Sequence, residues 1–217
     1  ALADACVDTK DVGKLVEQLK AEGLYNDALI LFTADHGEML GSHCLWQKMC
    51  MYEESARVPF ALRLPSEMAG ANRPARSREP ISHIDVLPTF CDLLELETPA
   101  GLPGRSLAGW LQGNAPPPPA PIFIQFDGNG ARGNFQRCIV DGTVKLIVDI
   151  FKDETFFELY DVEVDPQEQR NLAFEQQPVA RELAEKLRGH MRETNDLLAF
   201  TLDDYERFLR DYASCKP

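Results

Sequence analysis

The chain has 217 residues, of which 44% are hydrophobic and 26% charged, the proportions of an ordinary globular protein. Its net charge of -13 argues against nucleic acid and anionic membrane surfaces as partners, because like charges repel. No run of eighteen apolar residues occurs, so the sequence predicts no membrane-spanning helix.

The six cysteines show no C-x-x-C spacing. In a chain of this length they favour free, mostly buried thiols over a disulfide framework or a zinc ribbon. Free thiols in turn favour a reducing compartment such as the cytoplasm. The six are Cys6, Cys44, Cys50, Cys91, Cys138 and Cys215.

The first half of the chain has the pattern of an α/β fold. Apolar residues recur at helical spacing over 12–19, and Gly23 ends that helix. The continuous apolar run at 28–32 predicts a strand covered on both faces, as in a parallel sheet. A second strand is expected at 58–64, and a helix at 83–94 capped by Ser82 or Asp85.

The segment "NAPPPPAP" at 114–121 can continue neither a helix nor a central strand, so it predicts a linker. We therefore expect one domain at 1–113 and another at 122–217. The second domain shows four β-rich runs, with an Asp141-Gly142 hairpin signal between two of them, which predicts an antiparallel meander. Two helices should follow. The β-rich runs are 122–126, 135–140, 144–151 and 156–162, and the helices are 179–198 and 202–213.

Several residues suited to metal binding or catalysis come just after the strand expected at 28–32. Asp35 and His36 come just after it, and ligands bind beyond the carboxyl ends of strands in open α/β sheets. A carboxylate beside an imidazole suits a divalent cation. Lys48 could bind a tetrahedral oxyanion, and His43 could donate to a substrate oxygen or leaving group. The alternative is structural: Asp-His caps a turn and Lys48 is a surface charge.

An ordered series of motifs resembles the sulfatase family of the alkaline-phosphatase-like superfamily. Its nearest branch is that of choline-sulfatases and phosphonate monoester hydrolases. The resemblance implies part of an α/β sandwich with a mostly parallel sheet, followed by a smaller subdomain with an antiparallel sheet and helices. The motifs are "TADHGEMLGSH" (33–43), Lys48, "MYEESARVPF" (51–60), "HIDVLPTFCDLL" (83–94), "GRSLAGWLQG" (104–113), "VKLIVD" (144–149) and "ELYDVEVDPQEQRNLA" (158–173).

The resemblance also implies roles. Asp35 and His36 would bind a divalent metal, Ca²⁺ in the first place, with Mn²⁺, Mg²⁺ and Zn²⁺ as alternatives. Lys48 would bind the sulfate oxygens and stabilise charge on the bridging oxygen, and His43 would lie near the pocket mouth. The substrate would be a small-molecule or sugar sulfate ester. Four charged residues are expected to hold the loop after the metal ligands: Glu38, Glu53, Glu54 and Arg57.

The chain lacks several groups that the family needs: the nucleophile, the N-terminal Asp pair that completes the metal site, and a Lys and a His expected between the nucleophile and this segment. No cysteine or serine stands in the nucleophile motif C/S-x-P-x-R, whose cysteine becomes formylglycine. We therefore expect residues 1–217 to be the C-terminal part of a sulfatase, inactive alone, with the nucleophile upstream. Open strand edges could lead to self-association. Two alternatives remain: a phosphonate or phosphate diester hydrolase of the same superfamily, and a non-catalytic truncated domain.

Overall fold

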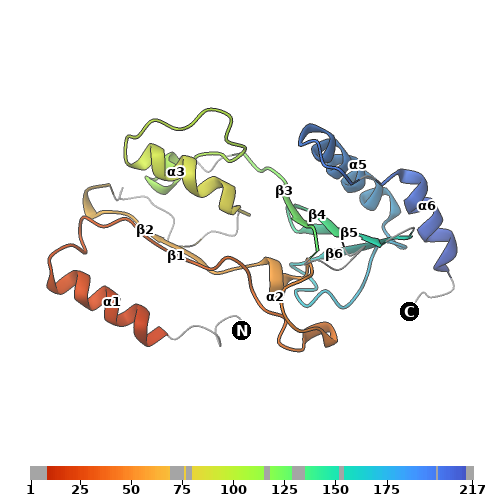
Figure 1. Cartoon of the computed structure of the whole chain (residues 1–217), viewed down its shortest axis with the longest axis horizontal. Coiled ribbons are helices and arrows are strands. Elements are labelled where there is room, and N and C mark those ends of the chain that lie inside the picture. The colour runs from red at the N-terminus through yellow and green to blue at the C-terminus, as the bar shows by residue number, and fades with distance from the viewer. Residues whose placement is uncertain are drawn as a thin grey trace. The chain divides into compact units, whose positions relative to one another are not determined.

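The computed structural model describes residues 9–68, 76, 80–114, 118–128, 135–151, 154–198 and 200–213, and Figure 1 traces them by colour along the chain. They form two compact units that interleave in sequence. The first comprises Ala1–Asp35 and Val58–Pro119, and the second His36–Arg57 and Ala120–Pro217. Residues 115–117 of the predicted linker lie outside the described residues, and the two-domain division at 114–121 stays a prediction.

The first unit contains the helix and the strands expected from the sequence. Gly23, at a φ of 73°, ends the first helix, and the amide of Leu24 then bonds the Leu19 carbonyl at 2.9 Å. The elements are α1 (Thr9–Ala21), β1 (Ile30–Thr33), β2 (Phe60–Arg63), η3 (Ser66–Met68), η4 (His83–Asp85), α3 (Val86–Leu93) and α4 (Ala108–Leu111).

The pairing of β1 with β2 corrects one expectation. The apolar run at 28–32 predicted a strand of a parallel sheet, but β1 and β2 are antiparallel, with Ile30 opposite Arg63 and Thr33 opposite Phe60. An apolar run indicates burial and says nothing about strand direction. A parallel pair needs a crossover element on one face of the sheet, whereas the chain between these strands packs in the second unit.

A small apolar core and a helix cap hold the first unit together. The core consists of Leu64, Leu93 and Ala108, with three partly buried leucines and Met68 around them. Asp85 is buried and makes the predicted cap, because its Oδ2 accepts from the Ser82 amide at 3.1 Å in a capping box.

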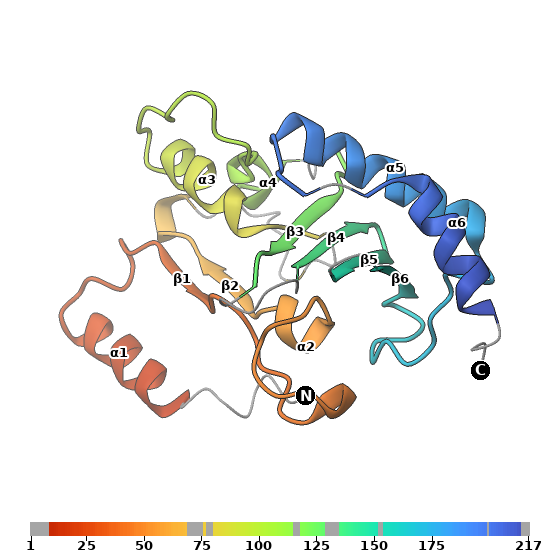
Figure 2. The same ribbon diagram turned by 45° about the vertical axis from the view of Figure 1, so that its right-hand side comes forward.

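The second unit is built on the predicted antiparallel meander. Four strands pair in sequence order, and Gly142, at a φ of 62°, follows Asp141 in the hairpin between the second and third. Two helices cover one face of this sheet in both views (Figures 1 and 2). The elements are η2 (Ser42–Cys44), α2 (Glu53–Ala56), β3 (Ile122–Phe126), β4 (Phe135–Asp141), β5 (Val144–Phe151), β6 (Glu154–Asp161), α5 (Gln177–Glu193) and α6 (Leu202–Asp211).

The two faces of this sheet bury different residues, since successive strand side chains point to opposite sides. The paired residues Ile139 and Leu146 lie in the large core beneath α5 and α6. The neighbouring pair, Cys138 and Ile147, lies in a second cluster with Met51 of the segment before α2. This second face therefore receives the loop that carries the candidate site.

The described cysteines are free, as predicted. Cys44 is exposed, whereas Cys50, Cys91 and Cys138 are buried. Cys6 and Cys215 lie outside the described residues. None of the described helices is both long enough and apolar enough to cross a membrane.

Candidate functional site

The predicted metal ligands stand where the chain passes from one unit to the other. Asp35 is exposed and closes the first unit, and half-buried His36 opens the second. His36 Nδ1 lies 2.7 Å from the carbonyl oxygen of Gly37. A proton on Nδ1 would make that contact a hydrogen bond and leave a lone pair on Nε2, the arrangement common in metal-binding histidines. That Asp35 and His36 bind the same metal ion stays a prediction.

Residues 36–57, here called the 36–57 loop, fold back on themselves. The amide of Gly37 bonds the Ser55 carbonyl at 2.8 Å, and the amide of Met39 bonds the Gln47 carbonyl at 2.9 Å. Gly37 has no room for a side chain, because a Cβ there would lie 1.9 Å from the backbone oxygen of Glu54. The glycine that follows His36 is thus a packing requirement of the loop.

Lys48 lies on the outer part of this loop. Its side chain is exposed, and its backbone carbonyl accepts a hydrogen bond from Ser55 Oγ at 2.8 Å. Trp46, two residues earlier, is 70% exposed. The backbone of Lys48 is therefore fixed while its ammonium group faces solvent, where an anion can reach it.

His43 contacts the rest of the second unit. Its ring stacks on Tyr52 with centroids 3.9 Å apart, and its Nε2 lies 3.0 Å from the Gln167 carbonyl oxygen. A backbone φ of 50° places His43 in the left-handed region. These contacts anchor the tip of the 36–57 loop, and the catalytic role of His43 stays a prediction.

A buried ion-pair group ties the base of the loop to the sheet. Lys145 Nζ lies 3.0 Å from Glu53 Oε1 and 2.8 Å from Glu168 Oε1, and both Lys145 and Glu168 have fully buried side chains. Glu168 Oε2 also accepts from the Glu53 amide at 2.6 Å. Burial raises the pKa of Glu168, although the Lys145 charge opposes this rise. Burial opposes the charged form of Lys145 too, but nearby Cys138 and the two carboxylates raise its pKa above its ordinary value.

Lys145 and Glu168 were not expected from the sequence. The available signal was Lys145 itself, a charged residue inside the apolar run "VKLIVDIF". Almost no lysine is fully buried without a partner, so that run required a nearby carboxylate.

A second polar group lies on the same face of the sheet. Glu158 Oε2 accepts hydrogen bonds from the hydroxyls of Tyr52 at 2.8 Å and Tyr160 at 2.6 Å. Nearby, Asp149 Oδ2 accepts from Gln136 Nε2 at 3.3 Å, and burial raises the pKa of Asp149. Tyr52 thus holds the 36–57 loop at two points, through its hydroxyl and through its ring under His43.

Within the described ranges, one group of three metal-capable side chains comes together: His43, Glu54 and Glu168, with ligand atoms within 4.8 Å of one another. Protein groups already contact each of them. Ser42 Oγ donates to Glu54, and Lys145 neutralises Glu168. The Lys145 ammonium would also repel a cation. The group is better explained as part of the loop anchor than as a metal site.

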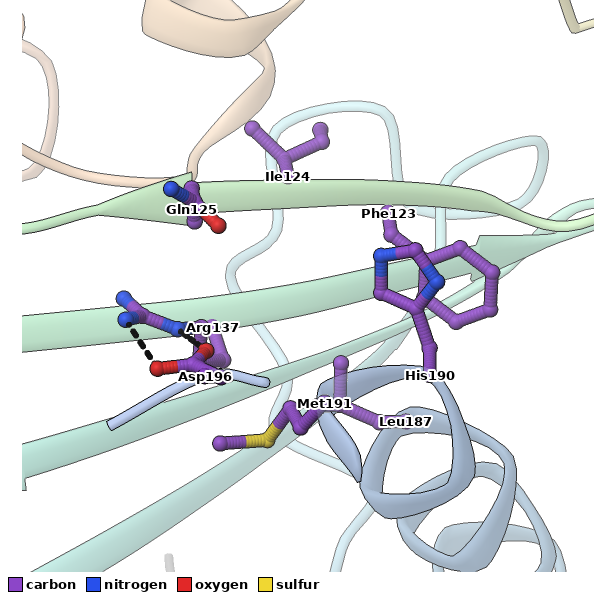
Figure 3. Close-up of a pocket in the computed structure, with 8 residues that line it drawn as sticks. All are labelled: Phe123, Ile124, Gln125, Arg137, Leu187, His190, Met191 and Asp196. Atoms are coloured by element: carbon purple, nitrogen blue, oxygen red, sulfur yellow. Dashed lines mark hydrogen bonds and ion pairs between the residues drawn. The ribbon is translucent and has the colours of Figure 1, made fainter. Parts of the chain in front are cut away.

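A small cavity in the second unit contains none of the predicted site residues. It measures about 40 Å³ and lies between α5 and strands β3 and β4 (Figure 3). At one end Arg137 forms an ion pair with Asp196 at 2.5 Å, and at the other His190 stacks on Phe123 with centroids 3.8 Å apart. The cavity has room for about one water molecule and is too small for a sulfate ester.

Comparison with known proteins places this geometry in a family. The model of the family "N-sulphoglucosamine sulphohydrolase, C-terminal" matches residues 41–196, most of the chain. The match begins inside the 36–57 loop and includes the whole four-stranded sheet.

Individual relatives agree with this match. The choline-sulfatase of Rhizobium meliloti is 32% identical over 75% of this chain and 30% of its own length. The phosphonate monoester hydrolase of Agrobacterium radiobacter superposes with a TM-score of 0.68 at 29% identity, over 82% of this chain and 38% of that one. The structure of BT4656 in complex with its substrate D-glucosamine-2-N,6-O-disulfate gives a TM-score of 0.66 at 26% identity, over 91% and 38%. The chain spans about a third of the length of the curated relatives it matches.

Proposed function

Because the chain belongs to the N-sulphoglucosamine sulphohydrolase C-terminal family of sulfatases, we propose that it supplies the C-terminal part of the active site of a metal-dependent sulfatase. The observation that carries the proposal is the 36–57 loop. This loop begins with His36 beside the exposed Asp35 and presents the exposed Lys48 from a backbone fixed by Ser55.

Asp35 and His36 are the proposed metal ligands. The Nδ1 contact of His36 with the Gly37 carbonyl supports this role, since it orients the ring and favours a lone pair on Nε2. A carboxylate and an imidazole fit Ca²⁺, Mn²⁺, Mg²⁺ or Zn²⁺, and we propose Ca²⁺ first. When bound, the metal would neutralise charge on the ester oxygens and activate the nucleophile. Two ligands are too few for such a site, so the remaining ligands must come from another part of the enzyme.

Lys48 and His43 are the proposed catalytic residues. The Lys48 ammonium would donate to the sulfate oxygens and stabilise negative charge on the bridging oxygen as the ester bond breaks. His43 would donate to a substrate oxygen or to the leaving group. Its contacts with Tyr52 and Gln167 would keep the ring in place, and because Nε2 faces the Gln167 carbonyl, a proton given to the substrate would have to come from Nδ1.

The nucleophile is proposed to lie upstream of this chain. No C/S-x-P-x-R motif occurs among the 217 residues, so a formylglycine derived from such a cysteine would have to come from an N-terminal part. The proposed substrate is a small-molecule or sugar sulfate ester, in line with the choline-sulfatase relative and with the disulfated glucosamine bound by BT4656. The chain alone is then expected to be inactive.

A second candidate function is hydrolysis of a phosphonate or phosphate diester. The superposition on a phosphonate monoester hydrolase at 29% identity favours it. Both reactions place a tetrahedral anion between a metal and a lysine, so the residues of this chain serve either one.

Two assays test the proposal. The purified 217-residue chain, incubated with Ca²⁺ and 4-nitrophenyl sulfate, should release no nitrophenol; release that Asp35→Ala abolishes would disprove the inactivity. A longer polypeptide that contains both this chain and the upstream nucleophile should hydrolyse 4-nitrophenyl sulfate faster than 4-nitrophenyl phenylphosphonate. The reverse preference would favour the second candidate, and no turnover of either ester would favour a non-catalytic domain.

A further inference from the structure

Lys145 is a buried charge to which the proposed chemistry assigns no role. It lies in β5 on the sheet face opposite α5 and α6, with none of its side chain exposed. Its ammonium joins Glu53 of the 36–57 loop to Glu168, which follows β6 in the chain. Lys145 is 92 positions from Glu53 and 23 positions from Glu168 in the sequence. The contact therefore links the loop to the folded sheet and is not part of a local turn.

The single-turn helix α2 connects this ion pair to the candidate site. Glu53 opens α2 and is held twice, by its carboxylate on Lys145 and by its amide on Glu168. Ser55, in the same turn, holds both arms of the loop: its carbonyl accepts from the Gly37 amide, and its Oγ donates to the Lys48 carbonyl. The position of α2 therefore sets the backbone next to His36 and the backbone of Lys48.

We infer that Lys145 is a positioning residue, which places the 36–57 loop by pairing with Glu53 and Glu168. Without the ammonium, two carboxylates would face each other in a buried place, and a buried charge left without its partner is strongly unfavourable. Glu53 would then turn towards solvent and take α2 with it. The consequence for catalysis rests on the proposed function, whereas the placement of the loop does not.

Amide hydrogen exchange of the 217-residue chain, read residue by residue by NMR, tests the inference. Lys145→Met should speed exchange at Gly37 and Met39 about tenfold or more, and at the paired amides of β4 and β5 less than about twofold, because only the loop opens. Lys145→Arg keeps the positive charge and should return the loop amides to within about threefold of the parent. Lys186→Met is the matched control, since it removes an exposed lysine of α5 from two ion pairs, and it should leave loop exchange unchanged.

Equal acceleration in the loop and the sheet would overturn the inference, because Lys145 would then only stabilise the whole unit. Unchanged loop exchange would overturn it too. If Lys145→Met does not fold, Glu53→Gln serves instead, since it removes only the loop's charge and leaves Lys145 paired with Glu168. It should speed exchange at Gly37 and not in β5. Hydrogen exchange is measured without turnover. If the exchange pattern is as expected but the enzyme has no sulfatase activity, the proposed function is contradicted and the role of Lys145 in placing the loop is not.

Discussion

The imidazole of His43 lies flat on the ring of Tyr52, with an interplanar angle of 4°. The tip of the loop that carries Lys48 therefore rests on an aromatic residue whose hydroxyl is itself bonded to Glu158 in β6. Through this stack the loop tip packs against the sheet, and substitutions at His43 can measure what the stack contributes.

His43→Ala and His43→Phe should differ in stability. The alanine variant loses both the ring stack and the contact with the Gln167 carbonyl, and we expect a cost of about 2 kcal/mol. The phenylalanine variant keeps a ring over Tyr52 and should lose about 1 kcal/mol. Urea unfolding followed by circular dichroism measures both. Equal losses would mean that the stack contributes nothing. In the assembled enzyme, turnover lost in the stable His43→Phe variant would support the donor role.

Gly37→Ala should destabilise the second unit. The new Cβ would lie 1.9 Å from the Glu54 carbonyl oxygen, so the bond between the Gly37 amide and Ser55 must break or the backbone must shift, at a cost of about 2 kcal/mol or more. Gly189→Ala is the matched control. Nothing lies within 4 Å of that position inside α5, and the same change should stabilise by about 0.5–1 kcal/mol. Thermal unfolding of both variants measures the contrast, and shifts of the same sign would contradict it.

Asp149→Asn should stabilise the chain near neutral pH. Burial raises the pKa of Asp149, with the charge of Glu158 adding to the rise, so the folded state holds its proton more tightly than the unfolded state. Ionised Asp149 therefore lowers the free energy of unfolding at pH values above the pKa of the unfolded state. As the pH falls through the folded-state pKa and then below the unfolded-state pKa, the carboxyl is protonated in both states and this loss disappears. Asparagine removes the charge and can donate to the buried Gln136 Oε1, which has no other partner among the described residues.

The expected gain for Asp149→Asn is about 1 kcal/mol at pH 7.5, and it should shrink towards zero near pH 4. The urea midpoints of the parent chain and of the Asp149→Asn variant, determined at pH 7.5 and at pH 4, measure this gain. A gain that stays the same at the two pH values would show that the carboxylate charge is not the cause.

The second unit was largely predictable from the sequence, because its signals are local. The run 122–126 and the run 144–151 coincide with β3 and β5, and Asp141-Gly142 gave the hairpin between β4 and β5. The direction of β1 was not predictable, since the apolar run indicates burial without naming a partner strand. The packing of residues 36–57 against the sheet of the second unit depends on contacts between residues more than 90 positions apart, which periodicity cannot reveal.

The candidate site shows the same limit. Residue types and spacing singled out Asp35, His36, His43 and Lys48. Of the residues that hold the loop, Glu53 and Glu54 were expected from the sequence, whereas Lys145 and Glu168 were found only in the folded chain. Lys145 and Glu168 come from different strands and turns, and their meeting depends on sheet register and on the turn after β6. Candidate chemical side chains are thus easier to find in a sequence than buried partners that meet only in the folded chain.

We propose that Asp35, His36 and Lys48 belong to the active site of a sulfatase. The most direct measurement is the kcat/KM for 4-nitrophenyl sulfate of the polypeptide that contains both this chain and the nucleophile-bearing part. Lys48→Met and Asp35→Asn are compared with Lys186→Met, an exposed lysine outside the loop. We predict losses of about 10²–10³-fold for the first two and none for the control. Equal activity in all of these proteins would contradict the claim.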